Sequence, residues 1–208
     1  MSAVPKPRKL TEAEYLEIER AAEFKSEFYD GVMYPMQGPP GFDAAVGMAG
    51  ATYPHNRIKD NLARHIGNRL ADGPCFPMTS DMRVDVGTTG LRTYPDILIV
   101  CGEPEFADAA RDAVLNPKVI FEVLSPSTEK YDRGKKFDHY RQIPSLMEYV
   151  LVAQDEPVCE RFVRQPDGSW NLTAVSGLGG ELALATVPAR VPLADVYAGV
   201  TFPDLPLR

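Results

Sequence analysis

The sequence is poor in cysteine. Its three cysteines, Cys75, Cys101 and Cys159, lie far apart in the chain and form no C-x-x-C pair. This spacing argues against a disulfide scaffold and against a zinc site built from cysteine thiolates. We therefore expect all three cysteines to be buried free thiols.

Long hydrophobic runs are absent as well. No segment approaches the roughly 18 consecutive apolar residues that would span a bilayer. The basic residues at the N-terminus lead into the polar segment TEAE at residues 11–14, whereas a secretory signal would continue into an apolar one. A cytoplasmic location is expected on these grounds.

Basic residues are outnumbered by acidic ones. The chain has 22 Lys and Arg against 29 Asp and Glu, which gives a formal net charge of −7 at pH 7. Indiscriminate nucleic-acid binding depends on a surplus of lysine and arginine, so this activity is not expected. A local basic surface would still be compatible with these counts.

The size and composition suit a single globular domain. The chain has 208 residues, of which 44% are hydrophobic and 25% charged, close to the average of soluble domains. Pro5 and Pro7 interrupt regular structure near the N-terminus. We therefore expect a flexible tail over residues 1–10 and one domain over residues 11–208.

Two short apolar runs each carry one acid. The first is YPDILIV at residues 94–100, with Asp96 at its start, and the second is VIFEVL at residues 119–124, with Glu122 inside it. Both runs are typical of adjacent core strands. A carboxylate inside an apolar strand is costly to bury unless it is paired or binds a metal ion.

Local patterns predict the elements around these strands. Thr11 and Glu14 form a capping-box pattern, and Asp30-Gly31 between alternating apolar residues indicates a hairpin. Glu27 lies on the first arm of this hairpin and could face either solvent or the core. The other predicted elements are helices over about 12–20, 55–70 and 129–142, a helical turn over 192–197, a loop over 37–53, and strands over 75–86, 148–152, 158–164 and 170–175.

The two acids indicate a metal site. Asp96 and Glu122 are the hard oxygen ligands that Mg²⁺ or Mn²⁺ requires, and such an ion usually keeps waters that can serve as nucleophile. A lysine nearby would orient or deprotonate the attacking water and offset charge on a pentavalent phosphate. Together these groups are the parts of a metal-dependent phosphodiesterase.

At these residues the chain resembles the Uma-two family of restriction endonuclease-like proteins, within the PD-(D/E)XK nuclease superfamily. The resemblance runs from about residue 10 to about residue 155. The matching segments are, in chain order, LTEAEYL at 10–16, EFYDG at 27–31, His55, YPD at 94–96, EVLSPST at 122–128, Asp132, Lys136, Tyr140, and EY at 148–149.

The resemblance implies a restriction-endonuclease-like α/β (α+β) core. In this fold a mixed central β-sheet is flanked by helices, with extra N-terminal and C-terminal β-hairpins. The resemblance also implies that Asp96, Glu122 and the main-chain carbonyl of Val123 hold the metal ion, and that Glu27 is a further acidic member of the catalytic set. A homodimer is expected too, because two cuts in a duplex suit two sites.

One departure from the superfamily concerns the lysine. The position two residues after the second acid, normally lysine, is Leu124 here. In this family the lysine has moved to the following helix, which makes Lys136 the substitute. Lys136 shares a helix face with Asp132 and Tyr140, four residues away on either side. Lys135 is the alternative, although it points elsewhere, since adjacent helical residues are about 100° apart.

Several residues are weaker candidates for substrate contacts. They are His55, Arg57, Arg64, Lys135 and Tyr140. Each has a structural alternative, because a lone histidine near a helix N-terminus is often structural, an arginine-bearing helix face is often only solvated, and a tyrosine is often a core residue.

The predicted activity is Mg²⁺-dependent hydrolysis of phosphodiester bonds in DNA by an endonuclease, without membrane association. Two alternatives stay open. A nuclease acting on RNA cannot be separated from one acting on DNA by these residues. A non-catalytic binding or assembly module that kept the nuclease fold is favoured by the acidic net charge and by Leu124.

Overall fold

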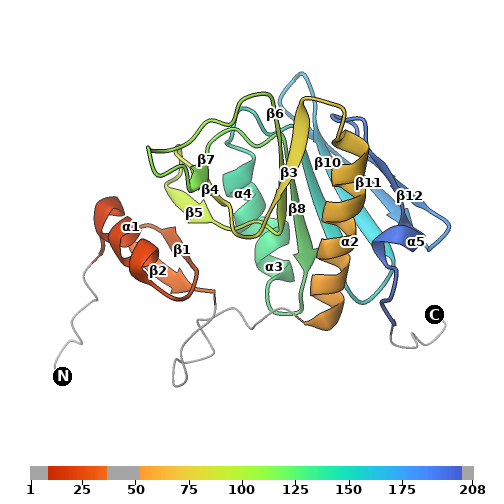
Figure 1. The fold of residues 1–208 in the computed structure, drawn as a ribbon, viewed down its shortest axis with the longest axis horizontal. Coiled ribbons are helices and arrows are strands. Elements are labelled where there is room, and N and C mark those ends of the chain that lie inside the picture. Colours follow the sequence, from red (N-terminus) through yellow and green to blue (C-terminus); the bar gives the residue numbers. More distant parts are fainter. Residues whose placement is uncertain (1–8, 37–51, 203–208) are drawn as a thin grey trace.

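A mixed β-sheet forms the centre of the molecule. The computed structural model describes residues 9–36 and 52–202 (Figure 1). The six strands of the central sheet lie in the order β11 (Trp170–Ser176), β10 (Val158–Arg164), β9 (Glu148–Ala153), β8 (Val119–Leu124), β6 (Ile97–Cys101) and β3 (Cys75–Thr79). The pair β8–β9 is parallel and the other neighbours are antiparallel.

A smaller sheet stands beside the central one. Its five strands lie in the order β2 (Val32–Pro35), β1 (Ser26–Tyr29), β5 (Leu91–Thr93), β4 (Arg83–Val86) and β7 (Ala113–Val114). A separate hairpin near the C-terminus pairs β12 (Glu181–Ala183) with β13 (Arg190–Pro192). The N-terminal β1–β2 hairpin and the C-terminal β10–β11 hairpin agree with the predicted fold class, and the β12–β13 hairpin was not predicted.

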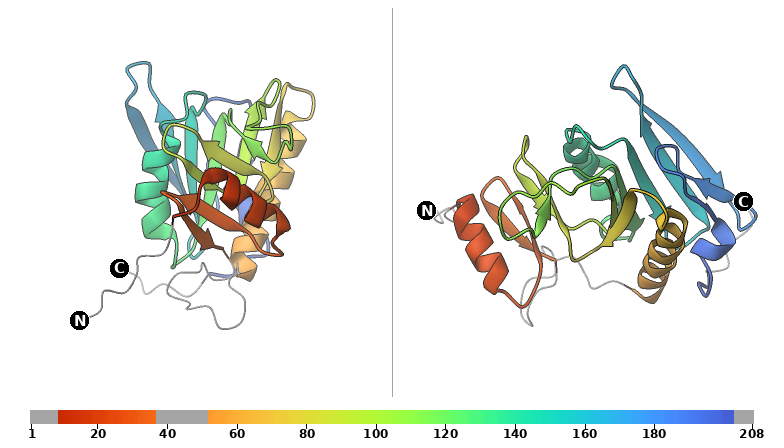
Figure 2. Two further views of the ribbon diagram at one scale, coloured as in Figure 1. Left: turned by 90° about the vertical axis from the view of Figure 1, so that its left-hand side faces the viewer. Right: turned by 45° about the horizontal axis from the view of Figure 1, so that its top comes forward.

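Helices lie on both faces of the central sheet (Figure 2). One face carries α2 (Tyr53–Leu70), and the other carries a continuous helical segment made of α3 (Glu129–Tyr131), the π-helix η1 (Asp132–Lys136) and α4 (Phe137–Tyr140). The helix α1 (Glu12–Ala21) packs on the smaller sheet, where Tyr15 stacks on Phe28 of β1, and α5 (Leu193–Val196) packs against α2 and β13. No helix within the described ranges is long and apolar enough to cross a membrane.

The alternation of strand residues divides the core into two clusters. In β8, Phe121 and Val123 pack on the α2 side with Ile58 and Leu62. Ile120 and Leu124 face the other side, in the cluster that contains Tyr140. Since side chains alternate between the faces of a strand, Glu122 shares the side of Ile120 and Leu124. It therefore faces the helical segment that carries the predicted lysine.

Several local predictions are confirmed. Thr11 and Glu14 form the predicted capping box of α1. Asp30 and Gly31 form the β1–β2 turn with φ values of 48° and 77°, the conformation that Asp-Gly turns favour. The predicted apolar face of α2 is buried. The predicted tail and the loop over 37–53 fall almost entirely outside the described residues.

The single strand predicted over 75–86 is wrong. The segment forms two strands, β3 in the central sheet and β4 in the smaller sheet. A turn separates them, in which the Met82 N–H donates to the Thr79 carbonyl at 3.0 Å. An alternating pattern does not reveal where a chain passes from one sheet to the next, and in β4 the polar residues Arg83 and Asp85 are buried as well as Val84 and Val86. The helix predicted over 129–142 is likewise interrupted by the π-helix.

The prediction of three free thiols is wrong for two of them. Cys75 and Cys101 form a disulfide. They are paired residues on the antiparallel strands β3 and β6, with Cα atoms 3.9 Å apart. Strand pairing thus joins two cysteines that are 26 residues apart in sequence. Cys159 is a buried free thiol, as predicted.

Reduction of this disulfide is expected to destabilise the fold. Opening a loop of this length lowers the free energy of unfolding by about 3 kcal/mol, because the reduced unfolded chain gains conformational freedom. Urea denaturation with and without dithiothreitol measures the difference. The double variant Cys75→Ser/Cys101→Ser should be insensitive to the reductant, and an equal response from both proteins would contradict the assignment.

Candidate active site

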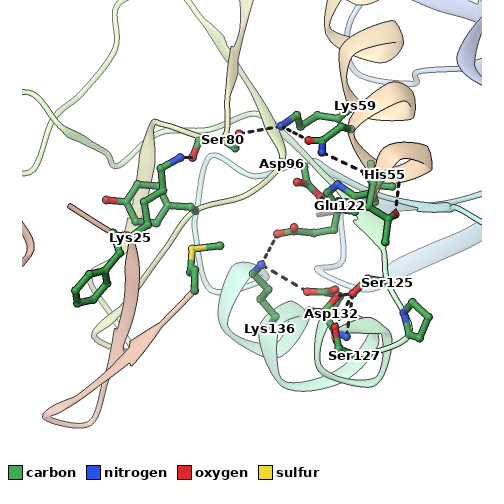
Figure 3. Close-up of a pocket in the computed structure, with 18 of the residues that line it drawn as sticks. Lys25, His55, Lys59, Ser80, Asp96, Glu122, Ser125, Ser127, Asp132 and Lys136 are labelled. Carbon is green, nitrogen blue, oxygen red and sulfur yellow. Dashed lines mark hydrogen bonds and ion pairs between the residues drawn. The ribbon is translucent and has the colours of Figure 1, made fainter. Parts of the chain in front are cut away.

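Strand pairing brings Asp96 and Glu122 together. In the antiparallel pair β6–β8, Ile97 is opposite Phe121, so Asp96 and Glu122 occupy the next opposed position. Directly opposed residues of antiparallel strands project to the same side of the sheet. Both acids line one cavity (Figure 3). The prediction that the two runs form adjacent core strands is therefore confirmed.

Asp96 is held by two donors. The Val123 N–H donates to Oδ2 of Asp96 at 2.8 Å, and Nε2 of His55 lies 3.3 Å from the same oxygen. Burial alone would raise the pKa of Asp96, but His55 and the Val123 N–H outweigh burial and lower this pKa. Asp96 is therefore a carboxylate at neutral pH.

Glu122 is buried and paired with Lys136. Nζ of Lys136 lies 2.9 Å from Oε1 of Glu122, and the Tyr140 hydroxyl donates to the same oxygen at 2.9 Å. Burial raises the pKa of Glu122 well above the usual range of a carboxyl group. Burial alone would lower the pKa of Lys136, but Glu122 and the other nearby acids raise it well above its usual value. Lys136 is therefore a cation.

Lys136 also contacts two further buried acids. Its Nζ lies 3.6 Å from Oε1 of Glu27 and 3.5 Å from Oδ1 of Asp132. Glu27 thus faces the core, not solvent, and it accepts hydrogen bonds from Thr93 and Tyr131. Three acids therefore contact this one lysine, and Asp96 lines the same cavity, so carboxyl groups outnumber the single ammonium group here.

The π-helix places Lys136 among these acids. Asp132 and Lys136 are its first and last residues, and both are buried. Short π-helical segments inside helices are frequent at functional sites. The resemblance drew attention to Asp132 only as a motif residue. The spacing of four residues between Asp132 and Lys136 was the one signal in the sequence that these two side chains are in contact.

Two lysines, Lys25 and Lys59, also line the cavity, and Lys25 forms an ion pair with Asp81. The cavity has a volume of about 960 Å³, and Figure 3 shows Lys25 and Lys59 across it from Lys136 and Asp132. Lys25 donates to the Ser80 carbonyl at 3.0 Å, and Nζ of Lys59 lies 3.3 Å from Oγ of Ser80. Neither lysine was predicted from the sequence, because they come from separate elements and belong to no motif.

The weaker candidates are divided between the cavity and other places. His55 lines the cavity, and Tyr140 is fully buried beneath it. Arg57 donates to the Ala198 carbonyl at 3.0 Å, and Arg64 lies against Asn61 and His65; neither arginine lines the cavity. Lys135 is exposed and lines a second, neighbouring pocket.

The residues present fit a hard divalent cation. Among the described residues, no three His, Cys, Asp or Glu side chains form a preassembled metal cluster. Mg²⁺ does not require one, because it commonly binds through one or two carboxylates and keeps several waters. Asp96 and Glu122 are two such carboxylates, with the Val123 carbonyl as a third oxygen. In addition, Nδ1 of His55 is buried without a hydrogen-bond partner among the described residues.

Comparisons with solved structures support the fold. A crystal structure described as "a putative nuclease belonging to DUF820" from Anabaena variabilis matches with a TM-score of 0.68. The match covers 94% of this chain and 100% of that chain, at 16% sequence identity. This likeness supports the predicted restriction-endonuclease-like core.

Sequence comparisons extend over most of the chain. The uncharacterized protein sll1609 of Synechocystis sp. is 36% identical over 182 residues, which cover 88% of this chain and 96% of the relative. A second Synechocystis protein, slr1290, is 29% identical over 194 residues, or 93% of this chain and 94% of the relative. The model of the Uma2 family, described as "Putative restriction endonuclease", matches residues 12–194. The chain therefore belongs to the Uma2 family.

Proposed function

We propose that this protein is a metal-dependent nuclease that hydrolyses phosphodiester bonds in DNA. One observation carries the proposal: Asp96 and Glu122 line the same cavity, where a buried lysine is bonded to Glu122 at 2.9 Å. The descriptions of the family and of the similar crystal structure support a nuclease. In this proposal the protein acts in the cytoplasm as a homodimer.

Asp96, Glu122 and the Val123 carbonyl would hold Mg²⁺ or Mn²⁺. When bound, the ion would supply Lewis-acid chemistry at the scissile phosphoryl group. His55 fixes Asp96 through the contact of 3.3 Å between Nε2 and Oδ2. The Val123 N–H binds the same oxygen, so Oδ1 of Asp96 is the one left to face the cation.

Lys136 would act as a fixed positive charge. Its raised pKa keeps the proton on Nζ, so it suits the stabilisation of negative charge on the phosphate better than the removal of a proton from water. Of the two roles considered for this lysine, offsetting charge is the one we propose. Glu27 and Asp132 would hold its ammonium group in place.

Two further lysines of the cavity would contact neighbouring phosphates. Lys25 and Lys59 line the cavity across from Lys136 and Asp132 (Figure 3), and a nucleic-acid backbone needs cations along its path. These two lysines would allow binding despite the net charge of −7.

The test is a cleavage assay with Asp96→Asn. Wild-type protein is incubated with single-stranded, double-stranded and branched DNA and with RNA, in Mg²⁺, Mn²⁺ or EDTA. Cleavage should need the metal, and Asp96→Asn should reduce its rate by at least about tenfold, because the variant keeps an oxygen ligand but loses its charge. Asp72→Asn, at an exposed aspartate outside the cavity, is the matched control.

Each result of this assay has a definite meaning. Equal metal-dependent cleavage by wild type and Asp96→Asn would refute the assigned site. If the protein cleaves RNA and none of the DNA substrates, RNA replaces DNA as the proposed substrate.

A binding or assembly module is the second candidate. It is favoured by the contacts that Glu122 already makes with Lys136 and the Tyr140 hydroxyl. This candidate predicts that the folded protein cleaves none of the substrates and that calorimetry detects no Mg²⁺ or Mn²⁺ binding.

A further inference from the structure

A second pocket adjoins the candidate active-site cavity. It has a volume of about 390 Å³ and shares Ser127 and Thr128 with the larger cavity. Glu27 lines the second pocket, and its Oε1 lies 3.6 Å from Nζ of Lys136, which lines the cavity. The two spaces therefore share part of their walls.

The lining of this pocket is rich in aromatic rings. Tyr29 and Tyr34 come from the β1–β2 hairpin, and Tyr131 and His139 come from the helical segment. The ring of Tyr29 meets that of His139 edge to face, with centroids 4.7 Å apart, and 40% of Tyr29 is exposed. The Tyr131 hydroxyl donates to Oε2 of Glu27 at 3.2 Å, which fixes the ring.

A free cation lies beside these rings. Lys135 lines the pocket, is exposed, and makes no ion pair among the described residues. Its neighbour Lys136 points to the acids of the cavity. The helical segment thus places one lysine in each of the two spaces.

We propose that this pocket binds an unpaired nucleobase of the strand that is cut, with Lys135 at an adjacent phosphate. The inference rests on the proposed function and names its substrate class: single-stranded DNA, or the unpaired part of a branched substrate. Aromatic rings bind bases by stacking, and a cation beside them binds the backbone. In a duplex both faces of a base are covered by its neighbours, so a paired base cannot enter the pocket.

The test measures binding of a single-stranded oligonucleotide that contains one 2-aminopurine. Fluorescence anisotropy and 2-aminopurine emission are recorded in Ca²⁺, and a gel verifies that the oligonucleotide stays intact. Tyr29→Leu should weaken binding by about tenfold, in line with the loss of one stacked base, and should change the 2-aminopurine emission of the complex. Tyr53→Leu is the matched control, because Tyr53 is an exposed tyrosine that lines neither pocket.

Two further measurements make the test specific. Lys135→Met should also weaken binding, and its effect should shrink as salt is raised. An abasic oligonucleotide should bind wild type and Tyr29→Leu equally, because it has no base to stack. If Tyr29→Leu weakened binding of the abasic oligonucleotide as well, Tyr29 would not act by stacking on a base.

The result can contradict this inference and the proposed function separately. Equal affinities of Tyr29→Leu and Tyr53→Leu, or no oligonucleotide binding by wild type, would overturn the nucleobase pocket even if the protein cleaves DNA. Stacking that depends on Tyr29, in a protein that cleaves no substrate, would support the pocket and refute the nuclease.

Discussion

Replacing Glu122 with alanine is expected to reduce metal-dependent DNA cleavage by at least about 100-fold, since removing even an indirect partner of a metal ligand costs up to that factor. The variant loses both carboxylate oxygens at the centre of the candidate site. It also releases Lys136 from its contact at 2.9 Å. Calorimetry should show a comparable loss of Mg²⁺ affinity. This loss would indicate that Glu122→Ala acts through the metal ion and not only through the position of Lys136.

The control for this experiment is Glu103→Ala. Glu103 is exposed and lies outside the cavity, so its loss should change neither cleavage nor metal affinity. If Glu122→Ala fails to fold, Glu122→Gln keeps the side-chain volume and an acceptor for Lys136. Undiminished Mg²⁺ affinity in a folded Glu122 variant would rule this acid out as a ligand.

Replacing Lys136 with methionine is expected to lower the free energy of unfolding by about 3–5 kcal/mol, the usual effect of removing one partner from a buried ion pair. Lys136 is almost fully buried and is within 3.6 Å of Glu27, Glu122 and Asp132. Without it these acids lose their shared cation. Urea denaturation monitored by circular dichroism measures the change.

Lys130→Met provides the matched comparison. Lys130 lies on the same helical segment, is exposed, and has no ion pair among the described residues, so its replacement should change stability by no more than about 0.5 kcal/mol. Similar stabilities of the two variants would mean that Lys136 does not neutralise the buried acids.

The parts of the candidate site differ in how far they were predictable. Asp96 and Glu122 were found because a charged residue in an apolar strand is unusual on its own. Lys136 was found through the family resemblance. Lys25 and Lys59 were not found, because lysines are common on hairpins and helices. Only the tertiary structure shows that these two line the cavity.

Some predictions that depended on tertiary partners could not be decided locally. The hairpin pattern allowed Glu27 to face either solvent or the core, and it is buried beside Lys136. Cys75 and Cys101 were expected to be free, and strand pairing joins them. In each case the deciding contact is with a residue remote in sequence.

The sequence by itself determined the local elements of this protein: the capped start of α1, the Asp30-Gly31 turn, the buried face of α2, and the two acid-bearing strands. These depend on hydrogen bonds and burial patterns within a few residues. Only the tertiary structure decided that the segment over 75–86 enters two sheets, that three acids share one lysine, and that an aromatic pocket adjoins them. Such contacts are set by strand order and register, and a local pattern specifies which residues are buried but not against which partners they pack.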